Sequence, residues 1–242
     1  MTDLVDWFAG RVAETYDDDR ETASPEAVDP IVDFLEPYGG DGALELGIGT
    51  GRIALPLAAR GIRVAGIDLS PDMVAQLRAK PGGADLPVAI GDFATTPVEG
   101  AFSVVYLVFN TINNLTTQDA QVACFRNAAQ HLTPGGRFVI EVGVPDLQRL
   151  PRGERFRPFT VRPDRIGIDE YDVVTQGLIS HHYALEGDEV RQISVPFRYV
   201  WPSELDLMAQ LAGLTLEERW GGWRREPFTA ESTSHVSVWR GP

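Results

Sequence analysis

The chain has 242 residues, 43% of them hydrophobic, and its net charge at pH 7 is −14. This length fits one elaborated α/β domain, or one domain with an insert. The acidity argues against a nucleic-acid partner, whose phosphates need clustered lysine and arginine side chains. No stretch reaches the roughly 18 apolar residues of a membrane-spanning helix, so we expect a cytoplasmic protein with no membrane partner.

The N-terminal part of the chain predicts helices. Residues 3–16 carry apolar side chains at helical spacing, and Ser24 followed by Pro25 is typical of a helix start. That second helix runs to about Tyr38, where two glycines follow. We expect residues 1–40 to form N-terminal helices that cover a binding site as a lid.

Strands and helices then alternate, which predicts a mostly parallel sheet with helices on both faces. The glycine-rich residues 133–136 are predicted to turn into the fifth strand. We assign residues 41–145 to this α/β core. Its predicted strands lie at about 43–46, 62–67, 87–90, 102–108 and 136–142, and its predicted helices at 51–60, 71–79 and 117–132.

The pattern changes at residues 146–201, where apolar residues alternate along two stretches separated by a turn. This alternation predicts an antiparallel insert, which could cover the substrate or form a dimer contact. The sequence leaves a homodimer open. Residues 202–242 are predicted to return to the core with a helix and the last two strands. The predicted insert strands lie at about 179–185 and 193–201, and the last two strands near 214–220 and 234–240.

The turn after the first predicted strand carries a glycine at every second position. Residues 43–51 read Ala-Leu-Glu-Leu-Gly-Ile-Gly-Thr-Gly, and Asp68 ends the next predicted strand. Glycines at such a turn let the backbone approach a ligand closely. The amides that begin the following helix lack partners, and an acid after the second strand can accept hydrogen bonds from a ribose. Together these features predict a nucleoside-binding βαβ unit.

The glycine spacing separates two classes of nucleotide site. In the dinucleotide fingerprint the third glycine would stand at position 52, which is Arg52 here. The spacing found, with Glu45 ahead of it, resembles motif I of the class I S-adenosylmethionine-dependent methyltransferases. The resemblance covers roughly residues 30–145. It implies S-adenosylmethionine as cofactor and a Rossmann-like, doubly wound seven-stranded sheet with a reversed last strand.

The resemblance also implies which residues contact the cofactor. Asp68 is expected to accept from the ribose hydroxyls and Asp92 from the adenine amino group, while Tyr16 is similar to a tyrosine that folds over the cofactor. The full set that we expect at the cofactor is Tyr16, Glu45, Gly47, Gly49, Gly51, Asp68, Leu69, Met73, Asp92, Phe93 and Phe109.

Methyl transfer from a sulfonium is an in-line displacement, so the protein mainly has to position the acceptor and exclude water. A base is needed only when the acceptor has to lose a proton, and no catalytic signature stands out. Our candidates for the catalytic site are His181, His182, Tyr16 and Asn110. The histidines and the single cysteine show no spacing typical of a metal site.

The insert resembles those of aminosugar N-methyltransferases and of the glycine or sarcosine type, which implies a small-molecule acceptor, as in secondary metabolism. Oxygen and nitrogen acceptors both stay open. Two alternatives remain: an NAD(P)-dependent oxidoreductase, and a methyltransferase-like protein that binds the cofactor for another activity. Six arginines within 149–165 could bind an anionic acceptor or could simply balance an acidic body.

Overall fold

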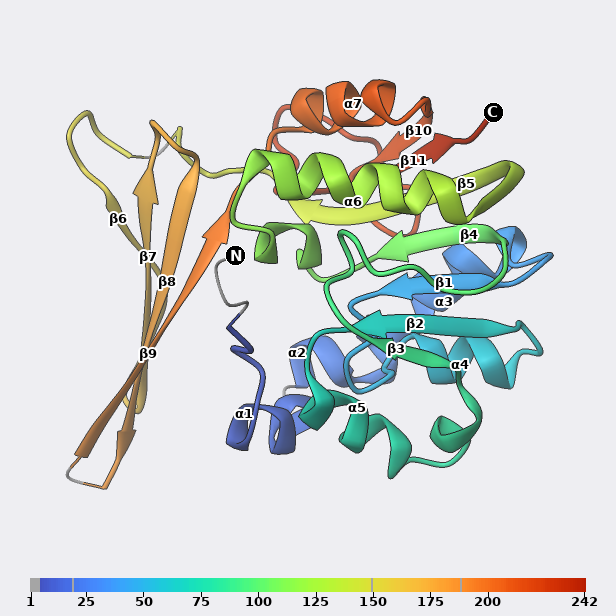
Figure 1. The fold of residues 1–242 in the computed structure, drawn as a ribbon. Coiled ribbons are helices and arrows are strands. Elements are labelled where there is room, and N and C mark those ends of the chain that lie inside the picture. The colour runs from blue at the N-terminus through green and yellow to red at the C-terminus, as the bar shows by residue number, and fades with distance from the viewer. Residues whose placement is uncertain (1–4, 19, 149, 188) are drawn as a thin grey trace.

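Two sheets organise the chain (Figure 1). The computed structural model describes residues 5–18, 20–148, 150–187 and 189–242. The larger sheet has seven strands in the order β10-β11-β5-β4-β1-β2-β3, and the smaller has four in the order β6-β7-β8-β9. The smaller sheet stands at one side of the larger one, beyond the carboxyl ends of its parallel strands.

The central strands of the larger sheet are buried on both faces, as expected for parallel strands covered by helices. Strand β1 pairs in parallel with β2 and with β4, whereas β11 runs antiparallel to both β5 and β10. The predicted doubly wound sheet with a reversed last strand is therefore confirmed. Its strands are β1 (Ala43–Leu46), β2 (Val64–Asp68), β3 (Val88–Ile90), β4 (Phe102–Leu107), β5 (Leu132–Gly143), β10 (Thr215–Trp220) and β11 (Ser234–Arg240).

The helices form two layers around this sheet. Helices α6 and α7 cover one face, and α3, α4 and α5 cover the other. No helix among the described residues has the length and apolar character needed to cross a bilayer. The helices are α1 (Arg11–Glu14), α2 (Arg20–Ala23), α3 (Pro25–Leu35), α4 (Ala54–Ala59), α5 (Pro71–Arg78), α6 (Gln118–His131) and α7 (Pro202–Leu211), with short 3₁₀ helices η1 (Tyr16–Asp18), η2 (Glu36–Tyr38), η3 (Gly83–Asp85) and η4 (Thr111–Asn114).

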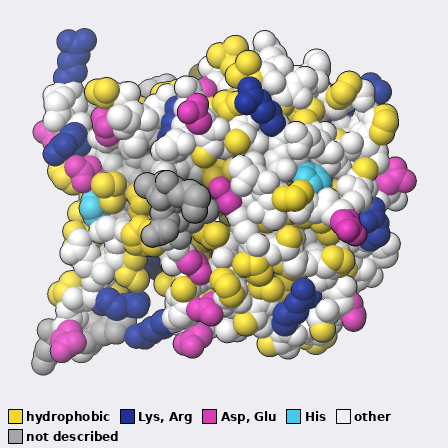
Figure 2. All heavy atoms as spheres, viewed as in Figure 1, with side chains coloured by type: hydrophobic (Ala, Val, Ile, Leu, Met, Phe, Trp, Pro, Cys, Tyr) yellow, Lys and Arg dark blue, Asp and Glu magenta, His cyan; other side chains and the backbone are white. Residues whose placement is uncertain are grey.

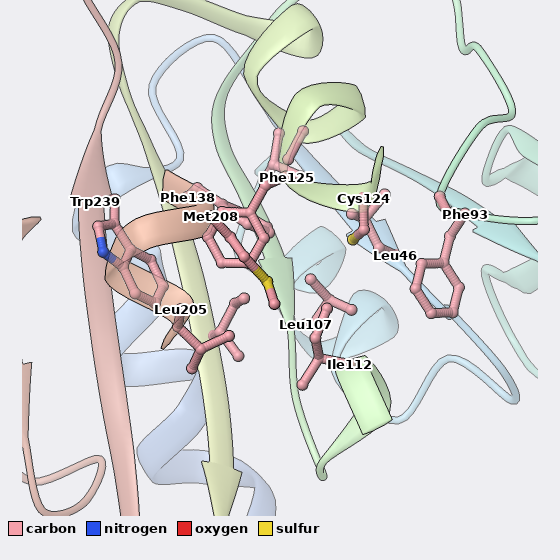
Figure 3. Close-up of a cluster of buried hydrophobic side chains, with 14 of the residues drawn as sticks. Leu46, Phe93, Leu107, Ile112, Cys124, Phe125, Phe138, Leu205, Met208 and Trp239 are labelled. Carbon is pink, nitrogen blue, oxygen red and sulfur yellow. The ribbon is translucent and has the colours of Figure 1, made fainter. Parts of the chain in front are cut away.

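An aromatic cluster fixes α6 and α7 on their face of the sheet (Figure 3). The ring of Phe125 on α6 packs edge to face against two other rings. Its centre lies 5.0 Å from that of Phe138 on β5 and 5.4 Å from that of Trp239 on β11. Leu205 and Met208 of α7 pack beside them. Because edge-to-face aromatic pairs are favourable and all five side chains are buried, this cluster holds the reversed strand β11 in place.

The predicted helix over residues 3–16 is wrong for most of its described length. Only Arg11–Glu14 is α-helical, Tyr16 begins the 3₁₀ helix η1, and residues 1–4 lie outside the described residues. Gly10 has a φ of 60°, which breaks a right-handed helix before Arg11, and the carboxylate of Asp6 accepts a hydrogen bond from the amide of Phe8. The segment therefore forms a strap, residues 5–18, rather than a long helix.

Two further differences concern strands. Residues 133–136 belong to β5, which starts at Leu132, with an irregular register against β4 in place of the predicted turn. The insert has four antiparallel strands where the apolar alternation predicted two; the added strands are richer in polar and charged residues. They are β6 (Phe156–Arg162), β7 (Arg165–Asp172), β8 (Gly177–Glu186) and β9 (Glu189–Arg198). The role of the insert and the division into four units stay predictions.

A buried polar network joins the insert to the core where β9 ends. Arg198 is 4% exposed, and its guanidinium donates to Gln121 of α6 and, at 2.7 Å, to Glu204 of α7. Burial by itself raises the pKa of Glu204, but hydrogen bonds from Arg198, Gln176 and Gln118 bring that pKa below its ordinary value. Because Arg198 is the last residue of β9, this ion pair ties the end of the insert to α7 of the core.

We expect Arg198→Met to lower the free energy of unfolding by about 3–5 kcal/mol, because it leaves the Glu204 carboxylate without its buried cation. Urea denaturation followed by circular dichroism measures the change. A matched control is Arg137→Met, which removes a more exposed ion pair with Glu217 and should cost about 1 kcal/mol or less. Equal losses in the two variants would contradict an anchoring role for Arg198.

Candidate functional site

The glycine turn after β1 leaves no room for side chains. Gly47, Gly49 and Gly51 all have left-handed φ angles, of 80°, 53° and 77°. A Cβ on Gly47 would lie 2.7 Å from the Thr111 side chain, and one on Gly51 would lie 2.3 Å from Leu77. Only glycine suits these positions, so bare backbone lines the start of α4.

The carboxylate of Asp68 closes this turn from the neighbouring strand. It accepts hydrogen bonds from the amide of Gly49 at 2.6 Å and from the amide of Ser70 at 2.8 Å. Burial raises the pKa of Asp68, and these two amides oppose that effect by stabilising the ionised form. The predicted acid therefore lies directly against the predicted glycine turn.

A cavity of about 310 Å³ opens at the carboxyl ends of β1, β2 and β4. Ligands bind at this edge in open α/β sheets. Asn114, Thr116, Trp7 and Phe8 line it without having been predicted. The predicted cofactor residues that line it are Tyr16, Glu45, Gly47, Gly49, Asp68, Leu69, Met73, Asp92, Phe93 and Phe109.

Gly51 is the predicted cofactor residue that does not line this cavity. It lies behind the turn, where it lets the chain pack against Leu77 of α5, and it lines a second hollow with Leu55 and Lys80. The structure thus gives Gly51 a packing role next to the cavity. The alternating pattern alone could not separate the glycines that face the cavity from the one that faces α5.

Glu45 is a buried acid at the floor of the cavity. It is 3% exposed, and the hydroxyl of Tyr106 donates to it at 2.9 Å. Burial raises the pKa of Glu45 to about 8, although the hydrogen bond from Tyr106 opposes the shift. Near pH 7 the carboxyl is therefore mostly protonated in the protein without ligands.

Arg52 is a site residue that sequence reasoning missed, although it follows the glycine turn directly. Its guanidinium carbon lies 4.5 Å from the ring centre of Tyr16 and 4.4 Å from that of Phe109. The guanidinium also donates to the hydroxyl of Thr22 at 2.5 Å. Among the residues that the structure describes, Arg52 is the only cationic side chain lining the cavity. Because Arg52 lies far from Tyr16 and Phe109 in the sequence, the contact of its guanidinium with the two rings could not be predicted.

Two carboxylates fasten the strap, residues 5–18, beside the cavity: Asp72 of α5 accepts from the amide of Gly10 at 2.7 Å, and Asp17 makes the contacts at the other end. Asp17 accepts from the hydroxyl of Thr50 at 2.7 Å and pairs with the ammonium of Lys80 at 2.6 Å. Lys80 also donates to the carbonyl of Thr50 at 2.7 Å. The neighbouring Tyr16 is thereby held in the cavity lining beside Arg52, and the covering role of the N-terminus stays a prediction.

The two histidine candidates lie on opposite faces of β8 and outside the cavity lining. His181 shares its face with the cavity-lining Pro196, and its ring nitrogens lie 2.8 Å from Ser194 Oγ and 3.3 Å from Glu170 Oε2. His182 lies on the other face, 5.3 Å ring to ring from Phe159; burial lowers its pKa.

The other two catalytic candidates, Tyr16 and Asn110, differ in their position relative to the cavity. Tyr16 lines the cavity, and burial raises the pKa of its phenol. Asn110 is exposed, and its amide oxygen accepts from the amide of Gly143 at 2.6 Å, so it shapes the loop rather than lining the cavity. In the part of the chain that is described, no group of acidic, histidine or cysteine side chains could hold a metal ion.

The predicted arginine group is divided among separate partners. Arg155 pairs with Glu170 at 3.5 Å, Arg157 pairs with Asp146, and Arg165 contacts His182. Arg149 lies outside the described residues. Lysine and arginine side chains are also scattered among acidic ones on the face that Figure 2 shows. Arg155, Arg157 and Arg165 therefore do not converge on one anion site.

We expect the stability of the protein without ligands to fall as pH rises from about 5 to 8.5, in part because of Glu45. Its folded pKa of about 8 lies above the unfolded value near 4.5, so the folded state holds an extra proton between these values. Stability from this group is complete below the unfolded pKa and is lost as pH rises through the folded one.

Thermal unfolding measured across this range should show that Glu45→Gln, which keeps the shape but cannot ionise, has a flatter pH dependence than the unsubstituted protein. The exposed Glu99→Gln serves as the control and should leave the slope unchanged. Parallel curves for Glu45→Gln and the unsubstituted protein would show that Glu45 titrates normally.

Known proteins resemble this chain over nearly its full length. The family described as "Methyltransferase domain" matches residues 43–136. The cypemycin N-terminal methyltransferase of a Streptomyces species is 29% identical over 229 residues, which are 93% of this chain and 94% of that protein.

Solved structures agree with this result. The CcbJ methyltransferase of Streptomyces caelestis is 36% identical, with a TM-score of 0.83 over 95% of this chain and 96% of that one. The amino pentose methyltransferase CalS10 of Micromonospora echinaspora, solved with S-adenosylmethionine bound, shares the fold at 20% identity, with a TM-score of 0.69 over 97% and 99% of the two chains. Together with the glycine turn, Asp68 and the seven-stranded sheet, these similarities establish that the chain belongs to the class I S-adenosylmethionine-dependent methyltransferases.

Proposed function

We propose that the protein methylates a nitrogen atom of a small natural-product acceptor by in-line displacement. The observation that carries the proposal is the part of the cavity lining that is not assigned to the cofactor, where the strap contributes the carboxyl group of Asp6 and the rings of Trp7 and Phe8. Such a lining favours an amine over an anionic group. The similarity over 93% of the chain to a methyltransferase named for an N-terminal acceptor supports nitrogen.

The residues present fit S-adenosylmethionine. Bare backbone at Gly47 and Gly49 forms one wall, where a side chain would collide with Thr111 or crowd Met73. The Asp68 carboxylate beside this wall is placed to accept from ribose hydroxyls. When bound, the cofactor supplies a methyl group activated on a sulfonium, with a neutral leaving group.

We assign the adenine end of the cavity to Leu69, Met73, Asp92 and Phe93. Met73 is 3% exposed and Phe93 is 8% exposed, so together they offer a buried apolar slot for a flat ring. Asp92 also caps the turn that follows β3, because its carboxylate accepts from the amide of Ala94 at 2.8 Å. A carboxylate held in this way can accept from an exocyclic amino group at the edge of that slot.

We assign the methionine end to Arg52, Tyr16 and Phe109. A guanidinium next to two aromatic rings is shielded from water and is well suited to grip a carboxylate. The same rings exclude water from the methyl group. A neutral amine attacks through its lone pair as the bond from sulfur to the methyl group breaks, and the methylated ammonium product releases its proton to water. A base is therefore needed only where the acceptor binds as an ammonium that must lose a proton first. Tyr16, whose phenol stays protonated near neutral pH, acts here as a hydrogen-bonding wall.

Asp68→Ala should weaken binding of S-adenosylhomocysteine by about 1–3 kcal/mol, because hydrogen bonds to the ribose and to the Gly49 amide are lost. Isothermal titration calorimetry measures the change, with the exposed Asp85→Ala as the control. The unsubstituted protein should give heat with S-adenosylhomocysteine and none with NADPH. An unchanged dissociation constant in Asp68→Ala would show that Asp68 is misassigned.

The nitrogen preference is tested with paired acceptors that differ in one group. Short peptides and amino sugars with a free amine should be methylated, whereas the same compounds after N-acetylation should not. Formation of S-adenosylhomocysteine and a mass gain of one methyl group report turnover. Methylation of a hydroxyl in the acetylated compounds, without turnover of the amines, would assign the enzyme to oxygen acceptors instead.

A further inference from the structure

Strand β5 carries one acidic residue, Glu141, near its carboxyl end in an otherwise apolar run. Its carboxylate accepts a hydrogen bond from the amide of Phe109 at 2.6 Å, and the amide of Asn110 donates to it as well. Burial raises the pKa of Glu141, while these two amides favour its ionised form. Two successive amides directed at one anion make an arrangement that is strong because it is charge-assisted.

The two residues that Glu141 holds have an unfavourable backbone conformation. Phe109 has a φ of 54° and Asn110 a φ of 61°, both in the left-handed region. Asparagine visits this region readily, but phenylalanine does so rarely, because its Cβ crowds the carbonyl oxygen. A second contact supports the turn, in which Asn110 Oδ1 accepts from the amide of Gly143. Such strain persists only where surrounding contacts determine the conformation.

The direction of the Phe109 ring depends on this conformation. With the left-handed turn in place, the ring lines the cavity and its centre lies 4.4 Å from the guanidinium carbon of Arg52. Tyr16 contacts the same guanidinium at 4.5 Å. An extended or right-handed residue 109 would point its side chain elsewhere and would leave Arg52 with one aromatic neighbour.

We propose that Glu141 is a positioning residue. Its carboxylate holds Phe109 in the left-handed conformation and thereby keeps the ring against Arg52 at the methionine end of the cofactor cavity. Glu141 is absent from the residues lining the cavity, so it acts through Phe109. The inference rests on the proposed function, because the assigned ligand of Arg52 is the carboxylate of the cofactor.

A double-mutant cycle on binding of S-adenosylhomocysteine, followed by calorimetry, tests the proposal. Glu141→Ala should weaken binding about tenfold, because the hydrogen bonds to two amides are lost. Phe109→Ala should weaken it by a similar factor. The double variant should bind no more weakly than Phe109→Ala alone, since Glu141 has nothing left to position. Glu141→Gln keeps an accepting oxygen and should stay within about threefold of the unsubstituted protein.

The matched control is Glu217→Ala, which removes another acid bonded to β5, at Arg137 in the middle of the strand. It should leave binding unchanged. If Glu141→Ala does not fold, as judged by thermal unfolding, Glu141→Asp replaces it in the cycle, because its shorter side chain also loses the contact. Unchanged binding in the Glu141 variant, or effects of the two substitutions that add, would overturn the inference.

Absence of binding by the unsubstituted protein would instead overturn the proposed function, and the inference with it. The two failures are therefore distinguishable. A merely structural role for Glu141 would lower the unfolding temperature and would add to the effect of Phe109→Ala on binding. A positioning role predicts that the second substitution has no further effect on the dissociation constant.

Discussion

The hydrogen bond between the amide of Gly49 and the carboxylate of Asp68 is the contact on which the site depends. It forms at 2.6 Å with Gly49 at a φ of 53°, a conformation that favours glycine, and a Cβ at this position would also crowd Met73 Cε at 3.2 Å. The bond fixes the glycine turn to the neighbouring strand, and the cavity opens between them. This bond thereby fixes the floor of the cavity. The opening of the cavity is surrounded by Tyr16, Arg52 and Phe109.

Much of the core could be predicted because its signals are local. The buried strands β1 and β2 read as short apolar runs, and α5 starts at a serine cap followed by proline. The helix predicted for residues 3–16 was wrong because Gly10 has a positive φ, which interrupts a right-handed helix even though the apolar residues are helically spaced. The strands β6 and β7 lack a clean alternation, and pairing with β8 in the folded protein organises them.

The residues of the site also fall into two groups, those that could be predicted from the sequence and those that could not. Residues within the glycine turn or at the ends of β2 and β3 could be placed from the sequence, since chain order alone brings them to one edge of the sheet. Arg52 and Glu141 could not, because their importance comes from partners far away in the chain. His181 and His182 looked promising as neighbours, yet the alternation of a strand puts them on opposite faces, and neither lines the cavity.

The pKa values of the acidic residues in the site depend on burial more than on the net charge of the chain, which is −14. For Glu45, Asp68 and Glu141 alike, desolvation is the largest cause of a raised pKa. Hydrogen bonds from Tyr106 or from backbone amides oppose it in each case, but to different degrees. Backbone amides favour the ionised form of Asp68 (from Gly49, Ser70 and Leu69) and of Glu141 (from Phe109 and Asn110). Glu45 receives the phenol of Tyr106 and the Ala54 amide, but burial outweighs both and its pKa is about 8. A sulfonium cation entering this dry space would favour the charged form of Glu45, because opposite charges attract strongly where water is excluded.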